Sequence, residues 1–160
     1  MYDAPGKANF KDQNLQTNSS LLDMKLEIIK PSKALNKAYL KEKVSRYHIE
    51  LFKKNMKQLL ARINEQESEE HLKNVIADFL KDTWYKDQFE INTKDRNDLV
   101  IHTGKTSKEP VGVILEVKKP SNKAEMITDA KPNAKALQEL ILYYLRERID
   151  HSNTDIKYLV

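Results

Sequence analysis

The stretch VGVILEVKKP, residues 111–120, has the apolar and β-branched composition of a buried strand, yet it contains Glu116 and Lys118. Charged side chains are rarely buried unless an opposite charge or a metal ion accompanies them. A second apolar stretch, DLVIHT at residues 98–103, precedes it, and GKTSKEP, residues 104–110, has the composition of a loop. These residues predict two adjacent antiparallel strands with charged side chains among the apolar ones.

The register of this predicted strand pair decides which charged side chains share a face. If Thr103 faces Val111, then Asp98 lies opposite Glu116, and alternate residues of each strand point to the same side. Asp98, Glu116 and Lys118 would lie on one face of the pair, and the other face would be wholly apolar. Two carboxylates that face each other across a strand pair repel, so this arrangement needs a cation between them.

A divalent ion such as Mg²⁺ or Mn²⁺ suits this position, because it takes oxygen ligands and leaves coordination positions for water and a phosphate. Asp98 and Glu116 would hold the ion, and the main-chain carbonyl of Val117 could serve as a further ligand. Lys118 would help to deprotonate or orient an attacking water, or stabilise charge on the phosphate. Alternatively, Lys118 forms an ordinary ion pair with Asp98 or Glu116, and these residues alone leave both interpretations open.

The length of 160 residues is that of one domain and is sufficient for a hydrophobic core. The composition, 39% hydrophobic and 32% charged with 3 Gly and 5 Pro, is typical of a helix-rich domain. The absence of Cys excludes disulfides and Cys-based zinc sites. No apolar run approaches the length of a membrane span, and the start MYDAPGKANF does not resemble a signal segment, so we expect a cytoplasmic protein without a membrane partner. The net charge of +4 is compatible with a nucleic-acid partner but does not require one.

The chain is expected to divide into three parts, an N-terminal arm (residues 1–30), a helical extension (31–66) and an α/β core (67–160). The first part is rich in polar residues and lacks periodicity, whereas Ser32 and Ser45 are positioned to cap helices in the second. The core elements predicted by periodicity are a helix capped by Ser68, strands in 84–92, 98–103 and 111–117, a helix over about 134–149 and a strand beginning in 155–160.

Asn97–Asp98 on one predicted strand and Glu116–Lys118 on the next resemble the paired motif of the PD-(D/E)XK nuclease superfamily, with Asn97 in place of the proline of that motif. The resemblance implies an α/β fold of the restriction-endonuclease type, with an αβββαβ core, a central mixed sheet and, here, an N-terminal helical extension. It also implies metal-dependent hydrolysis in which Asp98, Glu116 and Lys118 are catalytic and Mg²⁺, or Mn²⁺, is the cofactor.

Two further features extend this resemblance. The run ALQELILYY, residues 136–144, resembles the helix of some superfamily members that carries a Gln and a Tyr about one turn apart, which implies a catalytic supporting role for Gln138. The spacing to either Tyr is one residue longer than usual. Superfamily members also often have a Glu in the first core helix that completes the metal shell, and Glu69 or Glu70 would supply it. Glu69 is favoured because it is in phase with Leu72 on the apolar face of that helix.

From about residue 25 to the end, the sequence resembles the N-terminal nuclease region of bacterial type IIG restriction enzymes, in which the nuclease is fused to a methyltransferase. The resemblance implies an endonuclease that acts on double-stranded DNA as part of a type II restriction-modification enzyme, and a chain that is a fragment ending within a strand. Linked methyltransferase and target-recognition domains would be its partners, with S-adenosylmethionine needed only in the methyltransferase, and a transient dimer would make double-strand cuts.

Two other functions stay open on the sequence. One is a different task within the same nuclease superfamily, such as junction resolution or recombination-linked degradation. The other is a non-catalytic DNA-binding or assembly module, in which the charged strand is structural.

Overall fold

The computed structural model of the chain describes residues 27–94 and 97–160, so most of the predicted N-terminal arm lies outside the described residues. The described elements are α1 (Pro31–Ala34), the 3₁₀ turn η2 (Tyr39–Lys41), α2 (Arg46–Arg62), α3 (Glu69–Leu80), the π-helical turn η3 (Lys81–Tyr85), β1 (Ile91–Lys94), β2 (Asn97–His102), β3 (Val111–Leu115), α4 (Lys135–Ile149) and β4 (Tyr158–Leu159). The fold is α/β, as the sequence predicts.

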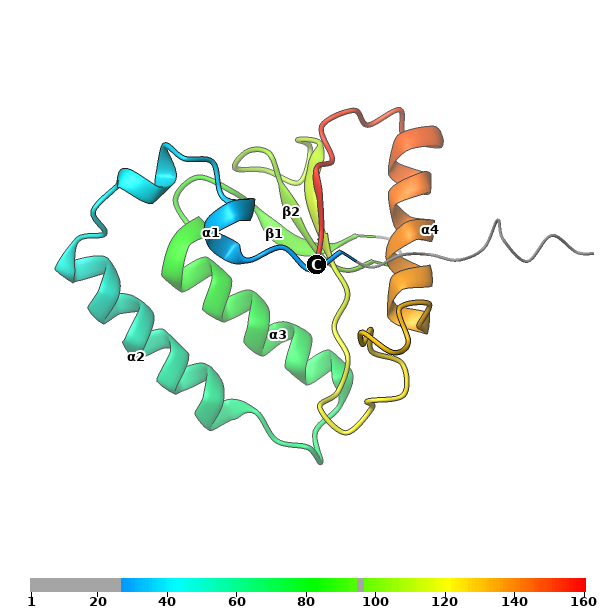
Figure 1. Ribbon diagram of the computed structural model, residues 1–160, viewed down its shortest axis with the longest axis horizontal. Helices are drawn as coiled ribbons and strands as arrows, with labels where there is room; N and C mark the ends of the chain where they lie inside the picture. Colours follow the sequence, from blue (N-terminus) through cyan, green and yellow to red (C-terminus); the bar gives the residue numbers. More distant parts are fainter. Residues whose placement is uncertain (1–26, 95–96) are drawn as a thin grey trace, which may run out of the picture.

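The four strands form one mixed sheet in the order β1-β2-β3-β4. The first three strands are antiparallel neighbours, and β4 pairs in parallel with β3 after the chain has returned through α4. Figure 1 shows α3 and α4 on either side of the sheet, with α2 outside α3. From α3 onward the chain therefore runs helix, three strands, helix and strand, which is the predicted order.

Each face of the sheet has its own apolar core, because neighbouring residues of a strand point in opposite directions. Val100 and Ile114 are buried with Leu140 of α4, whereas Leu99 is buried with Leu72 of α3. The predicted alternation along β2 is confirmed. The same alternation directs the side chains that follow β3 alternately towards the two helices.

The predicted register holds in the middle of the strand pair and is wrong at one end. Val100 pairs with Ile114 as expected, but His102 rather than Thr103 pairs with Val111, because a bulge interrupts the ladder after Ile101. His102 is buried there, with Nδ1 2.6 Å from the carbonyl oxygen of Glu109. The bulge lies at the opposite end of β2 from Asp98, so it does not disturb the predicted site.

The helical extension is less helical than the sequence predicts. Ser45 caps α2 by accepting a hydrogen bond from the His48 amide at 3.3 Å, as expected. The prediction that Ser32 caps a helix is wrong, because Ser32 lies inside α1 and no side chain caps that helix. Helix in this region is confined to α1 and the turn η2, since residues 27–50 are exposed throughout and no packing stabilises a longer helix. Over all described residues, no helix is long and apolar enough to cross a bilayer.

The strand predicted from Trp84 is also shorter than expected, because β1 begins only at Ile91. Trp84 lies in η3, where its ring centroid is 5.7 Å from that of Phe52 on α2 and 5.5 Å from that of Phe79 on α3. Aromatic packing between α2 and the end of α3 therefore favours continued helix over strand at this point.

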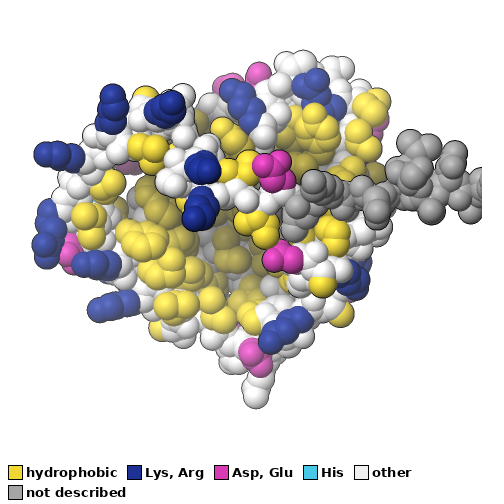
Figure 2. Space-filling view, in the orientation of Figure 1, with side chains coloured by type: hydrophobic (Ala, Val, Ile, Leu, Met, Phe, Trp, Pro, Cys, Tyr) yellow, Lys and Arg dark blue, Asp and Glu magenta, His cyan; other side chains and the backbone are white. Residues whose placement is uncertain are grey.

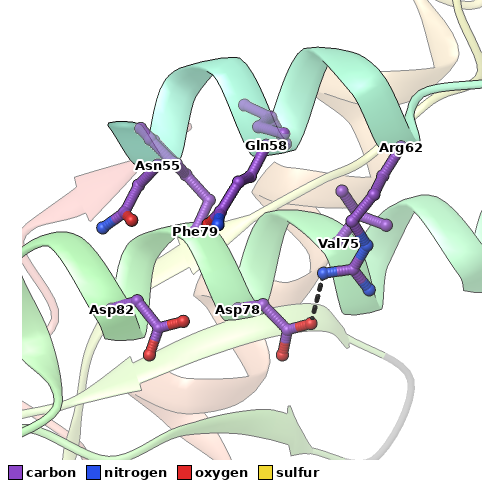
Figure 3. Close-up of a pocket in the computed structure, with 8 residues that line it drawn as sticks. Asn55, Gln58, Arg62, Val75, Asp78, Phe79 and Asp82 are labelled. Atoms are coloured by element: carbon purple, nitrogen blue, oxygen red, sulfur yellow. Dashed lines mark hydrogen bonds and ion pairs between the residues drawn. The ribbon is translucent and has the colours of Figure 1, made fainter. Parts of the chain in front are cut away.

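Polar contacts hold α2 against α3 and η3, and Figure 3 shows the pair Arg62 and Asp78 beside a small cavity of about 30 Å³. Arg62 Nη1 lies 2.7 Å from Asp78 Oδ2, and the buried Asn55 donates from Nδ2 to Thr83 Oγ1 at 3.2 Å. The cavity has room for about one water molecule and does not resemble a ligand site.

Candidate functional site

Asp98 is the first buried charged residue of the sheet, and its two carboxylate oxygens have different partners. Oδ2 accepts a hydrogen bond from the Val117 amide at 2.8 Å, and Oδ1 lies 2.7 Å from Nζ of Lys73 on α3. Its side chain is only 10% exposed. The contact with Val117 places the Asp98 carboxylate directly beside the segment that follows β3, as the strand alternation predicts.

Glu116 lies in that segment, and its side chain is 3% exposed. One oxygen, Oε1, is bonded to Nζ of Lys118, and the other, Oε2, has no hydrogen-bond donor among the described residues. When Glu116 is protonated, its carboxyl can itself donate to the Glu139 carboxylate on α4. A buried carboxylate oxygen without a donor is costly, and native structures contain few of them. Oε2 of Glu139 is also buried without a hydrogen-bond donor, but it lies 2.9 Å from Nζ of Lys118, so the Glu116 oxygen has the greater need of a further partner.

Lys118 is the centre of the cluster, with a side chain that is 5% exposed. Besides its bond to Glu116, its Nζ lies 2.9 Å from Oε2 of Glu139 on α4. Two longer contacts of 3.9 Å reach Glu69 at the start of α3 and Glu125 in the loop before α4. Carboxylates from α3, from α4 and from the loop before α4 therefore surround this one amine.

Burial and the neighbouring ionic partners have opposite effects on the pKa values of Glu116 and Lys118. Burial raises the pKa of Glu116 to about 7. The bond to Lys118 opposes this effect, whereas the charge of Asp98 and the hydrogen bond with Glu139 add to it. Burial tends to lower the pKa of Lys118, but its bonds to Glu116 and Glu139 outweigh burial and raise it. At neutral pH the lysine is a cation, whereas Glu116 is close to its own titration point.

The pKa of Tyr143, which lies one turn after Glu139 on α4, responds to the same cluster. Burial raises the pKa of Tyr143, and the charges of Glu116, Glu139 and Asp98 raise it further. The pKa of Glu139 is lowered instead: burial alone would raise it, but Lys118 overcomes that effect. Glu139 and Tyr143 therefore both belong to the face of α4 that meets the site.

Of the two helix acids expected to complete a metal shell, Glu69 lies at the site. Its Oε2 accepts a hydrogen bond from the Lys119 amide at 3.3 Å, and its Oε1 makes the long contact with Lys118. Glu70 has a side chain that is 62% exposed and pairs with Lys73 at 3.2 Å. The preference for Glu69 agrees with this geometry, while Glu70 contacts the site only through Lys73.

Gln138 does not reach the cluster. It is exposed, and its Nε2 donates to Oδ1 of Asn133 at 2.9 Å. Glu139 occupies the position on α4 that the sequence assigned to Gln138. The sequence contains a signal for this, because Glu139 precedes Tyr143 by four residues and so shares its helix face, whereas Gln138 does not.

Lys73 and Glu125 are two further members of the site that the sequence did not single out. Lys73 follows Glu69 by one helical turn, so its approach to the sheet could have been inferred from helical phase. The bonds to Asp98 and Glu70 raise the pKa of Lys73 against the opposing effect of burial. Glu125 lies in an irregular loop, where no periodicity predicts the direction of a side chain.

The ion-pair network has more negative than positive charge, a feature that favours a bound cation. It contains three ammonium groups and twice as many carboxylates: Lys73, Lys118 and Lys135 against Glu69, Glu70, Asp98, Glu116, Glu125 and Glu139. Within residues 27–94 and 97–160, no three His, Asp or Glu side chains are grouped as a complete metal site. Lys73 and Lys118 lie against the carboxylates, so a metal ion would have to displace an ammonium group.

The residues nonetheless suit a hard divalent ion, which takes oxygen ligands and needs only one or two carboxylates when water and a phosphate supply the rest. The carboxylates that could serve as ligands are Asp98 and Glu116 beside the sheet and Glu69 on α3, and the carbonyl of Val117 is a further oxygen in the Glu116 segment. Of these carboxylates, Asp98 and Glu69 already accept hydrogen bonds from main-chain amides. With Lys73 displaced from Asp98, the arrangement could hold a cation, and Lys118 would provide a second positive charge beside it.

Comparison with known proteins identifies a family but no relative of known activity. Neither the search of curated proteins nor the search of solved structures produced a match. A family described as "Domain of unknown function (DUF7149)" matches residues 29–160, which is most of the chain and includes every residue of the site. The chain therefore belongs to the DUF7149 family.

Proposed function

We propose that this domain is a Mg²⁺-dependent endonuclease that hydrolyses phosphodiester bonds in double-stranded DNA. The observation that carries the proposal is the buried Oε2 of Glu116, which has no hydrogen-bond donor and feels the charge of Asp98, with Lys118 paired to both Glu116 and Glu139 of α4. Nucleases of the PD-(D/E)XK type use this combination of residues, and the helix, three strands, helix and strand order supports a core of that type. Mn²⁺ would be an alternative ion.

The residues of the site would have two roles, binding the metal ion and orienting the attacking water or stabilising the phosphate charge. Asp98 and Glu116, with the Val117 carbonyl and Glu69, would hold the ion, which when bound lowers the pKa of water and polarises the phosphate. Lys118, held in place by Glu139, would stabilise the charge that develops on the phosphate or orient the attacking water. Glu70 would act indirectly by holding Lys73.

The resemblance to type IIG enzymes extends this proposal to partners. The domain would act within a bacterial type II restriction-modification enzyme, in the cytoplasm, linked to methyltransferase and target-recognition domains. S-adenosylmethionine would serve the methyltransferase alone. A transient dimer would provide the second nuclease centre for a double-strand cut. The DNA affinity of the domain would decrease with salt, because phosphate contacts would dominate it.

A second candidate, a non-catalytic DNA-binding or assembly module, is favoured by one observation. Lys73 pairs with Asp98 and Lys118 pairs with Glu116, so the two central carboxylates already have cationic partners. Under this alternative the cluster only holds α3 and α4 to the sheet, and removing a carboxylate would affect stability but no reaction.

Nicking of supercoiled plasmid by the full-length protein separates the two candidates. We expect Mg²⁺-dependent nicking that Asp98→Ala and Lys118→Ala each abolish, while Gln138→Ala, which lies outside the cluster, retains it. Circular dichroism of each variant would confirm that the fold is intact. Nicking that persists in both cluster variants would refute the nuclease proposal, as would the absence of nicking in the wild-type protein together with no Mn²⁺ binding by calorimetry.

A further inference from the structure

The surface formed by residues 28–63 is both apolar and basic. Within it, ten large apolar side chains are at least 37% exposed: Ile28, Ile29, Leu35, Tyr39, Leu40, Val44, Tyr47, Ile49, Leu60 and Ile63. The same range contains ten Lys or Arg residues and only two acids, Glu42 and Glu50. Apolar side chains gather on this face in Figure 2, and contiguous exposed apolar patches often mark a surface that another molecule covers.

Helical geometry separates the two kinds of side chain on α2. Ile49, Met56 and Leu60 recur at intervals of seven and four residues, so they form one stripe along the helix. Lys53 and Lys57 form a neighbouring stripe on the solvent side. Figure 2 shows apolar side chains gathered in a hollow of this face, with Lys and Arg along its rim.

Most of the positive charge within residues 28–63 is uncompensated. Of the ten basic residues in the range, Arg46 and Lys53 share Glu50, and Arg62 pairs with Asp78. None of the other seven is within ion-pair distance of an acid in the described parts of the chain. The hollow therefore presents an apolar floor beside an unneutralised positive edge.

We propose that this hollow binds an acidic amphipathic helix of a protein partner. Such a helix can lay apolar side chains, spaced three and four residues apart, against Ile49, Met56 and Leu60. Its acidic side chains would then meet Lys53 and Lys57, where opposite charges favour the complex and its orientation. This inference concerns a different surface from the carboxylate cluster and does not depend on the nuclease proposal.

Two other classes of partner fit this surface less well. A DNA duplex could use the basic residues of this surface but not its apolar side chains, because phosphates make no use of exposed Leu60 or Val44. A lipid bilayer is flat, whereas part of the apolar surface in Figure 2 is hollowed, and a helix can enter a hollow that a flat membrane surface does not fill.

The test measures binding of a fluorescein-labelled synthetic helix, about three heptads long, with Leu at the a and d positions and Glu at the flanking positions. A control peptide has the same composition with its leucines distributed around the helix. We expect fluorescence anisotropy to show that the full-length protein binds the first peptide and not the second. Both Leu60→Glu and the Lys53→Glu/Lys57→Glu pair should weaken binding about tenfold or more.

Ile149→Glu is the matched control, because Ile149 is 70% exposed on α4, away from α2. It should leave binding unchanged. If Leu60→Glu alters the fold, the Lys53→Glu/Lys57→Glu variant still tests the proposal. Both lysines are exposed, so their substitution should leave the fold intact.

The proposal is overturned if the acidic peptide does not bind or binds the variants as well as the wild type. It is equally overturned if phosphatidylserine vesicles or duplex DNA bind this face in its place, or if Leu60→Glu abolishes self-association of the protein.

Discussion

Lys118 Nζ lies 2.9 Å from Glu139 Oε2, and this ion pair joins the segment after β3 to α4. The same amine is bonded to Glu116 on its own segment. Two carboxylates from different elements therefore hold one buried lysine in position. A residue that needs a defined orientation beside a phosphate is best held in this way, by partners on rigid elements.

Glu139→Ala should lower the free energy of unfolding by about 1–3 kcal/mol, because it leaves Lys118 with a single short carboxylate contact in a buried position. Plasmid nicking should decrease with it. Urea denaturation measures the first effect. Gln138→Ala is the control, and we expect a change within about 0.5 kcal/mol because Gln138 is exposed. Equal losses in the two variants would contradict the assignment of Glu139 to the site.

The raised pKa of Glu116 predicts how stability depends on pH. Because the folded state favours the protonated carboxyl, the Glu116 contribution is fully present below pH 4.5 and is lost as pH rises towards about 7. Glu116→Gln, which cannot ionise, should lack this loss. The melting temperature of the variant minus that of the wild type should therefore become more positive as pH rises from 4.5 to about 7. A difference that does not change with pH would show that the Glu116 pKa is not raised.

Metal binding should show the same titration. An ion bound by Glu116 requires the deprotonated carboxylate, so Mn²⁺ affinity should increase as pH rises through about 7. Calorimetry in two buffers with different ionisation enthalpies should detect proton release on binding at pH values below the Glu116 pKa. Glu116→Gln should bind Mn²⁺ much more weakly and release no proton. Affinity that is independent of pH in the wild type would exclude Glu116 as a ligand.

Asp98→Asn should destabilise the protein by about 1–3 kcal/mol, although it removes one of two neighbouring carboxylates. The variant loses the ion pair with Lys73, whose side chain is only 17% exposed and would remain charged. Thermal and urea denaturation measure the effect. Glu70→Gln removes the other acidic partner of Lys73, but the Glu70 side chain is 62% exposed, so a change below about 1 kcal/mol is expected. An increase in stability in Asp98→Asn would mean that carboxylate repulsion outweighs the Lys73 pair.

The positions of Asp98 and Glu116 could be predicted from the sequence, because side chains alternate between the two faces of a strand with a period of two. Asp98 lies beside the Glu116 segment as expected, and the bulge near His102 does not alter this, because it lies at the other end of the strand. The helix residues were harder to predict. Neighbouring residues of a helix differ in direction by about 100°. The side chain of Gln138 therefore lies in solvent, whereas that of Glu139, one position later, lies at the site.

Local sequence determined the elements of this protein: Ser45 and Ser68 cap the helices they precede, and apolar alternation places β2 and β3 side by side. Only the tertiary structure decided which charges meet at Lys118, because Glu69, Glu125 and Glu139 approach it from elements whose packing no local pattern specifies. Alternation and capping depend on neighbouring residues. The meeting of distant carboxylates around one amine depends on how both helices pack against the sheet.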